Sequence, residues 1–201
     1  RMRELSLKLP VDSDIQIAIR FIEQSALYYA QVRGLGTLKL NSTKEYVEKY
    51  TEEFYLVDLY YRRTLEAYHE LITKENPIEQ TLSDAKHQLD LEYAKITNVL
   101  NLEWLTCVGE KGAWFTETGL KRQEDFYKNE SDTSVKQVVI VCDALRYEVA
   151  KELMQELAKE KHIATIDAYQ AMLPTETKYC KPALLPHRLL ELNGTDMMVD
   201  G

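Results

Sequence analysis

Two short segments of the sequence carry residue types that could bind a metal ion and attack a phosphate ester. Asp143 directly follows the apolar run 138–142, and Thr177 lies in the segment 173–179, Leu-Pro-Thr-Glu-Thr-Lys-Tyr. A carboxylate at the end of a strand is placed to hold a metal ion, because ligands collect at the carboxyl ends of strands in open α/β sheets. A threonine hydroxyl becomes a nucleophile once a metal or a base lowers its pKa.

Each of these residues also has a simpler interpretation. Asp143 precedes a helical pattern and could cap that helix. Thr177 could equally be a helix cap, with Thr175 as a turn residue. On position alone we favour capping for both, and only their joint occurrence, in this order, supports a metal site.

The elements expected around these residues are those of an α/β domain. The β-branched run Val138–Cys142 predicts a strand buried on both faces of a parallel sheet. Apolar residues at every fourth position from Val149 to Leu157 predict a helix after it. A second strand near 162–168 and another helix near 179–192 would complete the start of an α/β domain.

The region before this domain has a helical pattern. Apolar residues recur every three to four positions along three stretches. The first follows residue 12 and has an apolar face that begins with Ile15, Ile19 and Ile22. The second opens near Ser42 and can run as one long helix to about Thr73, and the third opens at Ile78 after a break at Asn76–Pro77. Ser42 and Glu45 have the spacing of a capping box. Amphipathic helices with short breaks pack as an antiparallel bundle, and the tyrosine-rich stripes suit its seams.

The expected fold class is therefore α + α/β, with an N-terminal helical bundle followed by the first part of an α/β sheet domain, which the resemblance described next implies to be alkaline-phosphatase-like. We assign the helical domain to residues 1–130 and the truncated α/β domain to residues 137–201. The polar segment 129–134 is the expected linker. An incomplete sheet would leave an exposed edge, along which two copies could pair as a dimer.

Both chemical segments resemble the PglZ domain family. Residues 138–148, Val-Val-Ile-Val-Cys-Asp-Ala-Leu-Arg-Tyr-Glu, are similar to the family's first-strand signature, an apolar strand followed by Asp-x-Leu-Arg. Residues 173–177 and the segment 183–187, Ala-Leu-Leu-Pro-His, resemble its nucleophile loop and the following helix. PglZ domains belong to the alkaline phosphatase superfamily, and many occur in BREX phage-defence systems.

The resemblance implies a role for three residues. Asp143 matches the first metal-ligating aspartate, and Thr177 matches the metal-bound nucleophile that takes the phosphoryl group from a phosphomonoester or phosphodiester. Arg146 is the signature arginine, which could either support the ligands or face the substrate. The cofactor implied for the complete domain is zinc or another divalent metal.

This chain alone offers too few ligands for tight metal binding, because zinc usually takes about three protein ligands. After Thr177 the remaining candidates are His187, Asp196 and Asp200, and their spacing differs from that of the superfamily's later ligands. We therefore expect the chain to hold no metal tightly and to be inactive. Arg1 precedes the first methionine, so we interpret the chain as a segment of a longer protein.

The expected function of the longer protein is a metal-dependent phosphatase or phosphodiesterase, a hydrolase of phage defence that acts with other defence-system proteins. The alternative is an assembly or scaffold component whose helical region docks partner proteins. A third interpretation, an unrelated helical protein with a small α/β appendage, would be favoured by a large separation of Asp143 and Thr177.

Composition excludes some classes of partner. The net charge of −8 argues against direct binding of nucleic acid by this chain. The sequence has no apolar run long enough to cross a membrane. Three widely spaced cysteines indicate free thiols in a reducing cytoplasm.

Overall fold

The computed structural model describes residues 13–72, 78–109, 118–132 and 134–200. Its contacts divide the chain into two compact units, one ending at Glu117 and the other beginning at Thr118. The predicted break at Asn76–Pro77 lies outside the described residues. The first unit contains α2 (Asp14–Gly34), α3 (Thr43–Lys49), a π-helix (Tyr50–Phe54), α4 (Tyr55–Ile72) and α5 (Glu79–Val108).

Side-chain caps fix where the first helices begin. Ser13 accepts a hydrogen bond from the Gln16 N–H at 3.3 Å, and Ser42 accepts one from the Glu45 N–H at 3.1 Å. The Glu45 carboxylate accepts the N–H of Asn41 at 2.9 Å. These bonds satisfy backbone donors that have no partner inside a helix. The predicted cap at Ser42 is confirmed.

The long helix expected after Ser42 is interrupted by the π-helix between α3 and α4. A π-helical turn contains an extra residue, so the side chains of α4 are rotated about the helix axis relative to those of α3. The predicted apolar face of α2 also differs from the observed one. Ile15 and Ile22 are 62% and 50% exposed, whereas Ile17 and Phe21 are buried.

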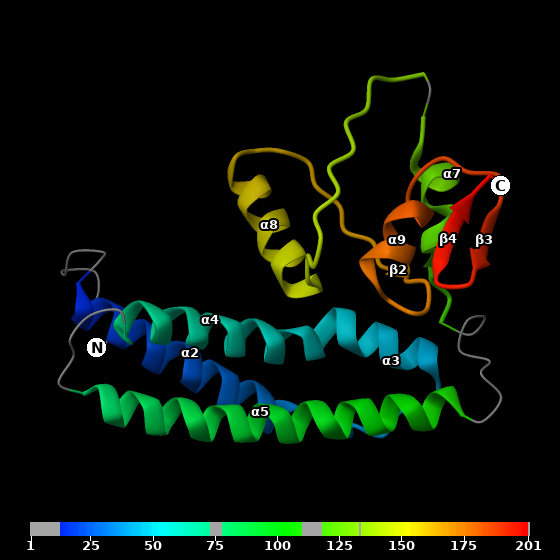
Figure 1. Ribbon diagram of the computed structural model, residues 1–201. Helices are drawn as coiled ribbons and strands as arrows, with labels where there is room; N and C mark the ends of the chain where they lie inside the picture. Colours follow the sequence, from blue (N-terminus) through cyan, green and yellow to red (C-terminus); the bar gives the residue numbers. More distant parts are fainter. Residues whose placement is uncertain (1–12, 73–77, 110–117, 133, 201) are drawn as a thin grey trace. The chain divides into compact units, whose positions relative to one another are not determined.

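Helices α2, α4 and α5 run alongside one another and enclose the core of the first unit (Figure 1). Near one end, α2 and α4 meet α5 through a first cluster of five buried residues, which consists of Ile17, Phe21, Ala67, Leu71 and Leu82. Farther along the same helices, Tyr28, Val57 and Leu89 form a second cluster.

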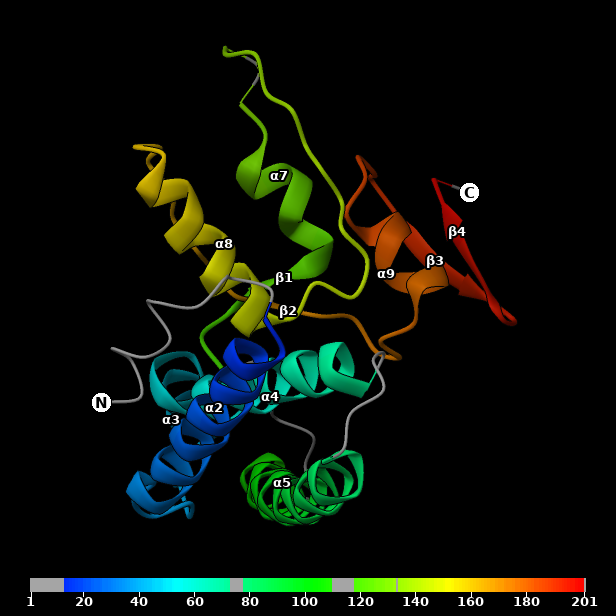
Figure 2. The same ribbon diagram turned by 90° about the vertical axis from the view of Figure 1, so that its left-hand side faces the viewer.

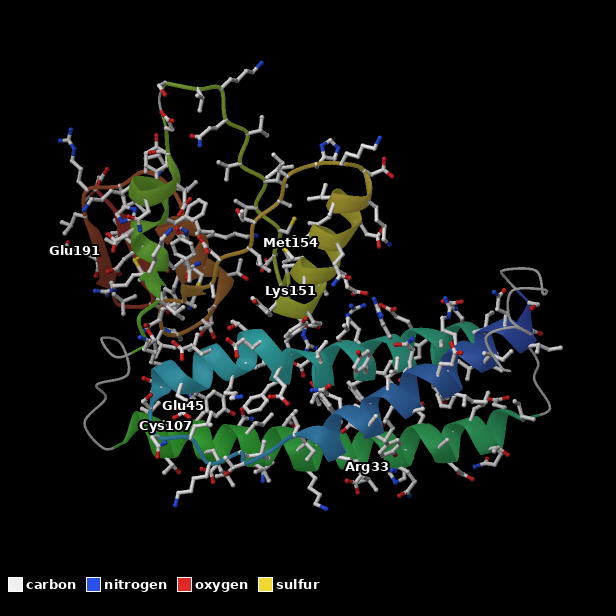
Figure 3. The ribbon with its side chains drawn as sticks, turned by 180° about the vertical axis from the view of Figure 1, so that it is seen from behind. Arg33, Glu45, Cys107, Lys151, Met154 and Glu191 are labelled. Carbon is white, nitrogen blue, oxygen red and sulfur yellow. The ribbon has the colours of Figure 1, made fainter. Side chains whose placement is uncertain are left out.

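A third cluster closes the other end of this unit, where α3 and α5 meet. Tyr46 and Phe54 pack there against Leu100. Cys107 lies beside Glu45 (Figure 3) and donates its thiol hydrogen to the Leu40 carbonyl at 3.3 Å. Burial raises the pKa of the Cys107 thiol, so the thiolate form is disfavoured.

A buried carboxylate connects the π-helix, α4 and α5. Asp58 on α4 accepts hydrogen bonds from the hydroxyls of Tyr50 at 2.6 Å and Tyr93 at 2.7 Å. The Tyr93 ring stacks on Tyr61, whose hydroxyl donates to Asp90 at 2.9 Å. Burial, with the Asp90 carboxylate next, raises the pKa of Tyr61 to about 12. The network therefore supplies polar partners inside an otherwise apolar seam.

Replacing Tyr93 with phenylalanine should destabilise the helical unit. The substitution keeps the stacked ring but removes one donor to a buried carboxylate, a loss of about 1–3 kcal/mol. Urea unfolding followed by circular dichroism measures the free energy of unfolding. Tyr60→Phe is the control, because Tyr60, like Tyr93, packs against the cluster of Tyr28, Val57 and Leu89. An equal effect in both variants would contradict the role given to the Tyr93 hydroxyl.

The second unit is a mixed set of short elements. The elements are β1 (Lys121–Arg122), a 3-10 turn (Gln123–Asp125), α7 (Phe126–Glu130), α8 (Tyr147–Lys159), β2 (Tyr169–Gln170), α9 (Thr177–Ala183), β3 (Leu190–Asn193) and β4 (Asp196–Val199). Strand β1 pairs with β2 in parallel. Strands β3 and β4 form an antiparallel hairpin that lies beside α9 (Figure 2).

The predicted buried strand at 138–142 is wrong in this structure. Val138 and Ile140 are 79% and 80% exposed, and strand pairing within the described ranges is confined to β1–β2 and β3–β4. A β-branched run becomes a strand only where neighbouring strands bond and cover it. The second expected strand, near 162–168, is also wrong, because the observed strand β2 covers Tyr169–Gln170. The helix expected to reach residue 192 ends at Ala183.

At the level of fold class the prediction is confirmed: a helical unit is followed by a unit that mixes helices with small sheets. Residues 118–130, which the sequence analysis assigns to the helical domain, belong to the second unit by their contacts. Among the helices in the described residues, none combines the length and the apolar character that a membrane span requires.

Candidate functional site

Asp143 lies in a sharp turn between the extended segment 138–142 and α8. Ala144, the next residue, has φ of 56°, in the left-handed region that non-glycine residues rarely adopt. The N-cap of α8 is Arg146. Asp143 therefore does not cap the helix that follows it, which removes the simpler interpretation of this residue.

Thr177 is the first residue of α9, and Glu176 is the N-cap. The Thr177 hydroxyl does not bond to the backbone of its own helix in the manner of a cap; it donates a hydrogen bond to Asp143 Oδ2 at 3.3 Å. The two predicted site residues thus meet although 34 positions separate them in the sequence. This proximity also counts against the unrelated-protein interpretation, which a large separation would have favoured.

Lys181 also contacts Asp143, and the sequence patterns did not identify it as a residue of the site. Its Nζ lies 3.2 Å from Asp143 Oδ2, the oxygen that also accepts the Thr177 hydroxyl. Thr177 and Lys181 are four residues apart on α9, a spacing that places them on one face of the helix. That spacing was the available signal, but it gains meaning only when Asp143 is known to face it.

The charge of this cluster follows from its geometry. Lys181 first, and the Thr177 hydroxyl to a smaller degree, hold the pKa of Asp143 below its ordinary value. Asp143 is therefore ionised throughout the neutral range, and the ion pair is lost only as the pH falls through that lowered pKa. The Asp143 side chain is 57% exposed, so the cluster is open to ligands from solvent.

Arg146 pairs with Glu148 in the first turn of α8, with Nε 2.9 Å from Oε1. The later candidate ligands lie with the hairpin. Asp200 Oδ1 accepts the backbone N–H groups of Arg188 at 2.7 Å and Leu189 at 3.0 Å, which lowers the pKa of Asp200. The structure accordingly gives Asp200 a role in closing the hairpin.

The donor atoms of the cluster fit one side of a divalent-cation site. A carboxylate and a hydroxyl are oxygen donors suited to hard cations, and they share one location. Within the ranges that the structure describes, no three His, Cys, Asp or Glu side chains gather as a metal site would require. A complete coordination shell therefore needs ligands beyond those described here.

Hollows of the second unit follow the extended segment 138–142. One of about 420 Å³ is lined by Val139, Ile140, Val141 and Cys142 together with Phe126 and other residues. Asp143 and Thr177 do not line it. Its lining is mainly apolar, so the chemistry of the Asp143 cluster, rather than cavity size, identifies the candidate site.

Known proteins resemble this chain in the same region. The family model described as "BREX system PglZ alkaline phosphatase-like domain" matches residues 124–201. The chain is 37% identical over 93 residues to "Alkaline phosphatase-like protein BrxZ" of Escherichia coli O9:H4 (strain HS), a match that covers 41% of the chain and 11% of that relative. No solved structure matches the chain.

A second relative extends the similarity toward the N-terminus. "Alkaline phosphatase-like protein PglZ" of Bacillus cereus (strain H3081.97) is 29% identical over 184 residues, 85% of this chain and 21% of the relative. Residues 124–201 alone cannot supply that share, so the helical unit takes part in the match. The chain spans about a fifth of this relative's length. Its C-terminal part, residues 124–201, is therefore similar to the BREX-system PglZ alkaline phosphatase-like domain.

Proposed function

We propose that this chain contributes one side of the active site of a metal-dependent phosphatase or phosphodiesterase that acts in phage defence. The observation that carries the proposal is the contact between Thr177 Oγ1 and Asp143 Oδ2 at 3.3 Å, inside the PglZ-matched region. An alkaline-phosphatase-like reaction requires a hydroxyl nucleophile beside an anionic metal ligand. These two residues supply that combination.

In this proposal Thr177 is the nucleophile. Its oxygen gives its proton to solvent water and attacks the phosphorus of a phosphoester, while the bond from phosphorus to the leaving oxygen breaks and the leaving oxygen takes a proton from water. A water molecule then attacks the phosphothreonine, which releases phosphate and restores the Thr177 hydroxyl. Asp143 accepts the hydrogen bond of the Thr177 hydroxyl at 3.3 Å and orients it. Arg146 would stabilise the turn or contact the substrate.

Asp143 and Thr177 would hold the cation, which we propose to be zinc or another divalent metal. Such an ion lowers the pKa of a bound hydroxyl and stabilises the leaving oxygen. Because the described residues bring only two candidate ligands together, further ligands would have to be added for tight binding.

The test is hydrolysis of a generic phosphodiester by the full-length protein that contains this chain, with zinc, manganese or magnesium. We expect turnover that chelation removes and that Asp143→Asn reduces by about a hundredfold, the usual scale for a lost metal contact. Asp167→Asn, a 70% exposed carboxylate of the same unit, is the matched control. Inertness with every metal would favour the assembly function instead.

The 201-residue chain itself should show no phosphoesterase turnover. Its described residues offer one carboxylate and one hydroxyl at the candidate site, which is less than a zinc ion needs. A phosphodiester assay of the purified chain with added metal measures this. Turnover that disappears in Thr177→Ala would contradict the expectation.

We further propose that the longer protein works in the cytoplasm with other proteins of a BREX system. The names of the family and of BrxZ support the association with BREX systems. Cys107, Cys142 and Cys180 are free thiols, as a reducing compartment favours. Dimer formation along a strand edge stays a prediction, and sedimentation velocity would measure it.

A further inference from the structure

Lys181 contacts the carboxylate of Asp143, the residue to which the proposed function assigns a divalent cation. Its Nζ lies 3.2 Å from Asp143 Oδ2, while the Thr177 hydroxyl donates to the same oxygen at 3.3 Å. A divalent cation bound to that oxygen would lie about 2.0–2.6 Å from it. The ammonium and the metal would then be separated by less than about 6 Å, a short distance between like charges.

The ion pair is built so that it can open. The side chains of Lys181 and Asp143 are 50% and 57% exposed, and exposed ion pairs are weak. Lysine also carries a compact charge on a flexible stem, which can turn to solvent without moving the helix. A metal could therefore displace Lys181, but only in competition with it.

We propose that Lys181 is an internal competitor for metal at Asp143. In this structure it is a positioning residue that contacts the Asp143 carboxylate on the oxygen that faces Thr177. When a divalent cation binds, Lys181 leaves Asp143 Oδ2 and its charge opposes retention of the metal. This inference rests on the proposed metal-binding role of Asp143.

The neighbouring Lys178 provides a matched comparison. It has the same charge and lies on the same short helix, but its Nζ pairs with Glu176 at 3.6 Å and lies over the Tyr179 ring. Replacing either lysine with methionine changes the net charge by the same amount. Only the change at Lys181 removes a cation from Asp143.

Titration of the 201-residue chain with Mn²⁺ tests the proposal, read as paramagnetic broadening of the backbone amide signals of residues 143 and 177. Lys181→Met should reach half-broadening at about fivefold lower Mn²⁺ than the unmodified chain, because it loses both the competing pair and the like-charge repulsion. Lys181→Arg should stay near the unmodified chain. Lys178→Met should shift the midpoint by less than about twofold, the effect of net charge alone.

The outcomes separate the two proposals. Equal or weaker Mn²⁺ binding by Lys181→Met, with broadening still centred on residues 143 and 177, would overturn the competitor role and leave the metal role of Asp143 intact. Broadening at these residues in no variant would contradict the metal role of Asp143, and the Lys181 inference with it. Broadening in Lys181→Met alone would support both.

Discussion

Replacing Thr177 with alanine should abolish phosphoester hydrolysis by the full-length protein. The substitution removes the oxygen that, in the proposed mechanism, attacks the phosphorus of the substrate, while the Asp143–Lys181 ion pair at 3.2 Å can remain. Loss of a nucleophile of this kind reduces kcat by about a thousandfold or more. Initial rates on a phosphodiester, measured at saturating metal, give the ratio of kcat values.

Thr175→Ala is the matched control for this experiment. Thr175 lies two positions before Thr177 in the same loop and carries the same hydroxyl group. It should retain activity within a few-fold of the unmodified protein, and Thr177→Ser should keep measurable turnover because it retains a hydroxyl. If Thr177→Ala stays as active as Thr175→Ala, Thr177 is not the nucleophile.

Leu89→Ala should strongly destabilise the helical unit. Leu89 is 1% exposed and packs in one cluster with Tyr28 of α2 and Val57 of α4. Truncation to alanine loses buried apolar surface and leaves a cavity, which lowers the free energy of unfolding by about 2–5 kcal/mol. Urea unfolding followed by circular dichroism at 222 nm measures this quantity.

The control lies two residues away on the same helix. Leu91 is 52% exposed, so Leu91→Ala removes the same atoms from a site where water already contacts them. The expected change is within about 0.5 kcal/mol, as for other surface substitutions. Similar losses in both variants would mean that α5 does not present the observed face to α2 and α4.

The sequence signals for the helices were strong because they are local. The Ser42 cap and the three-to-four-residue apolar spacing act within a single helix, so α2, α3, α4 and α5 follow from neighbouring residues. Which face becomes buried was less certain. In α2 the buried face contains Ile17 rather than Ile15, because the choice depends on where α4 lies.

The hairpin β3–β4 shows a local signal that the sequence analysis overlooked. Gly194 and Thr195 form the two-residue turn between the paired residues Asn193 and Asp196, and Gly194 has φ of 63°, a conformation that tight hairpin turns require and glycine favours. The helix predicted from the sequence continues instead to residue 192, over most of β3. The strand expected at 138–142 failed for the opposite reason, since its β-branched residues lack bonded neighbours among the described residues.

The sequence by itself determined that Asp143 and Thr177 could share one chemistry, because residue types and motif order are local properties. Only the tertiary structure decided that their side chains meet at Asp143 Oδ2, that neither caps a helix, and that Lys181 shares the same oxygen. A carboxylate's partners are set by which chain segments the fold brings within hydrogen-bonding distance. That choice depends on contacts across 34 residues, which no local pattern encodes.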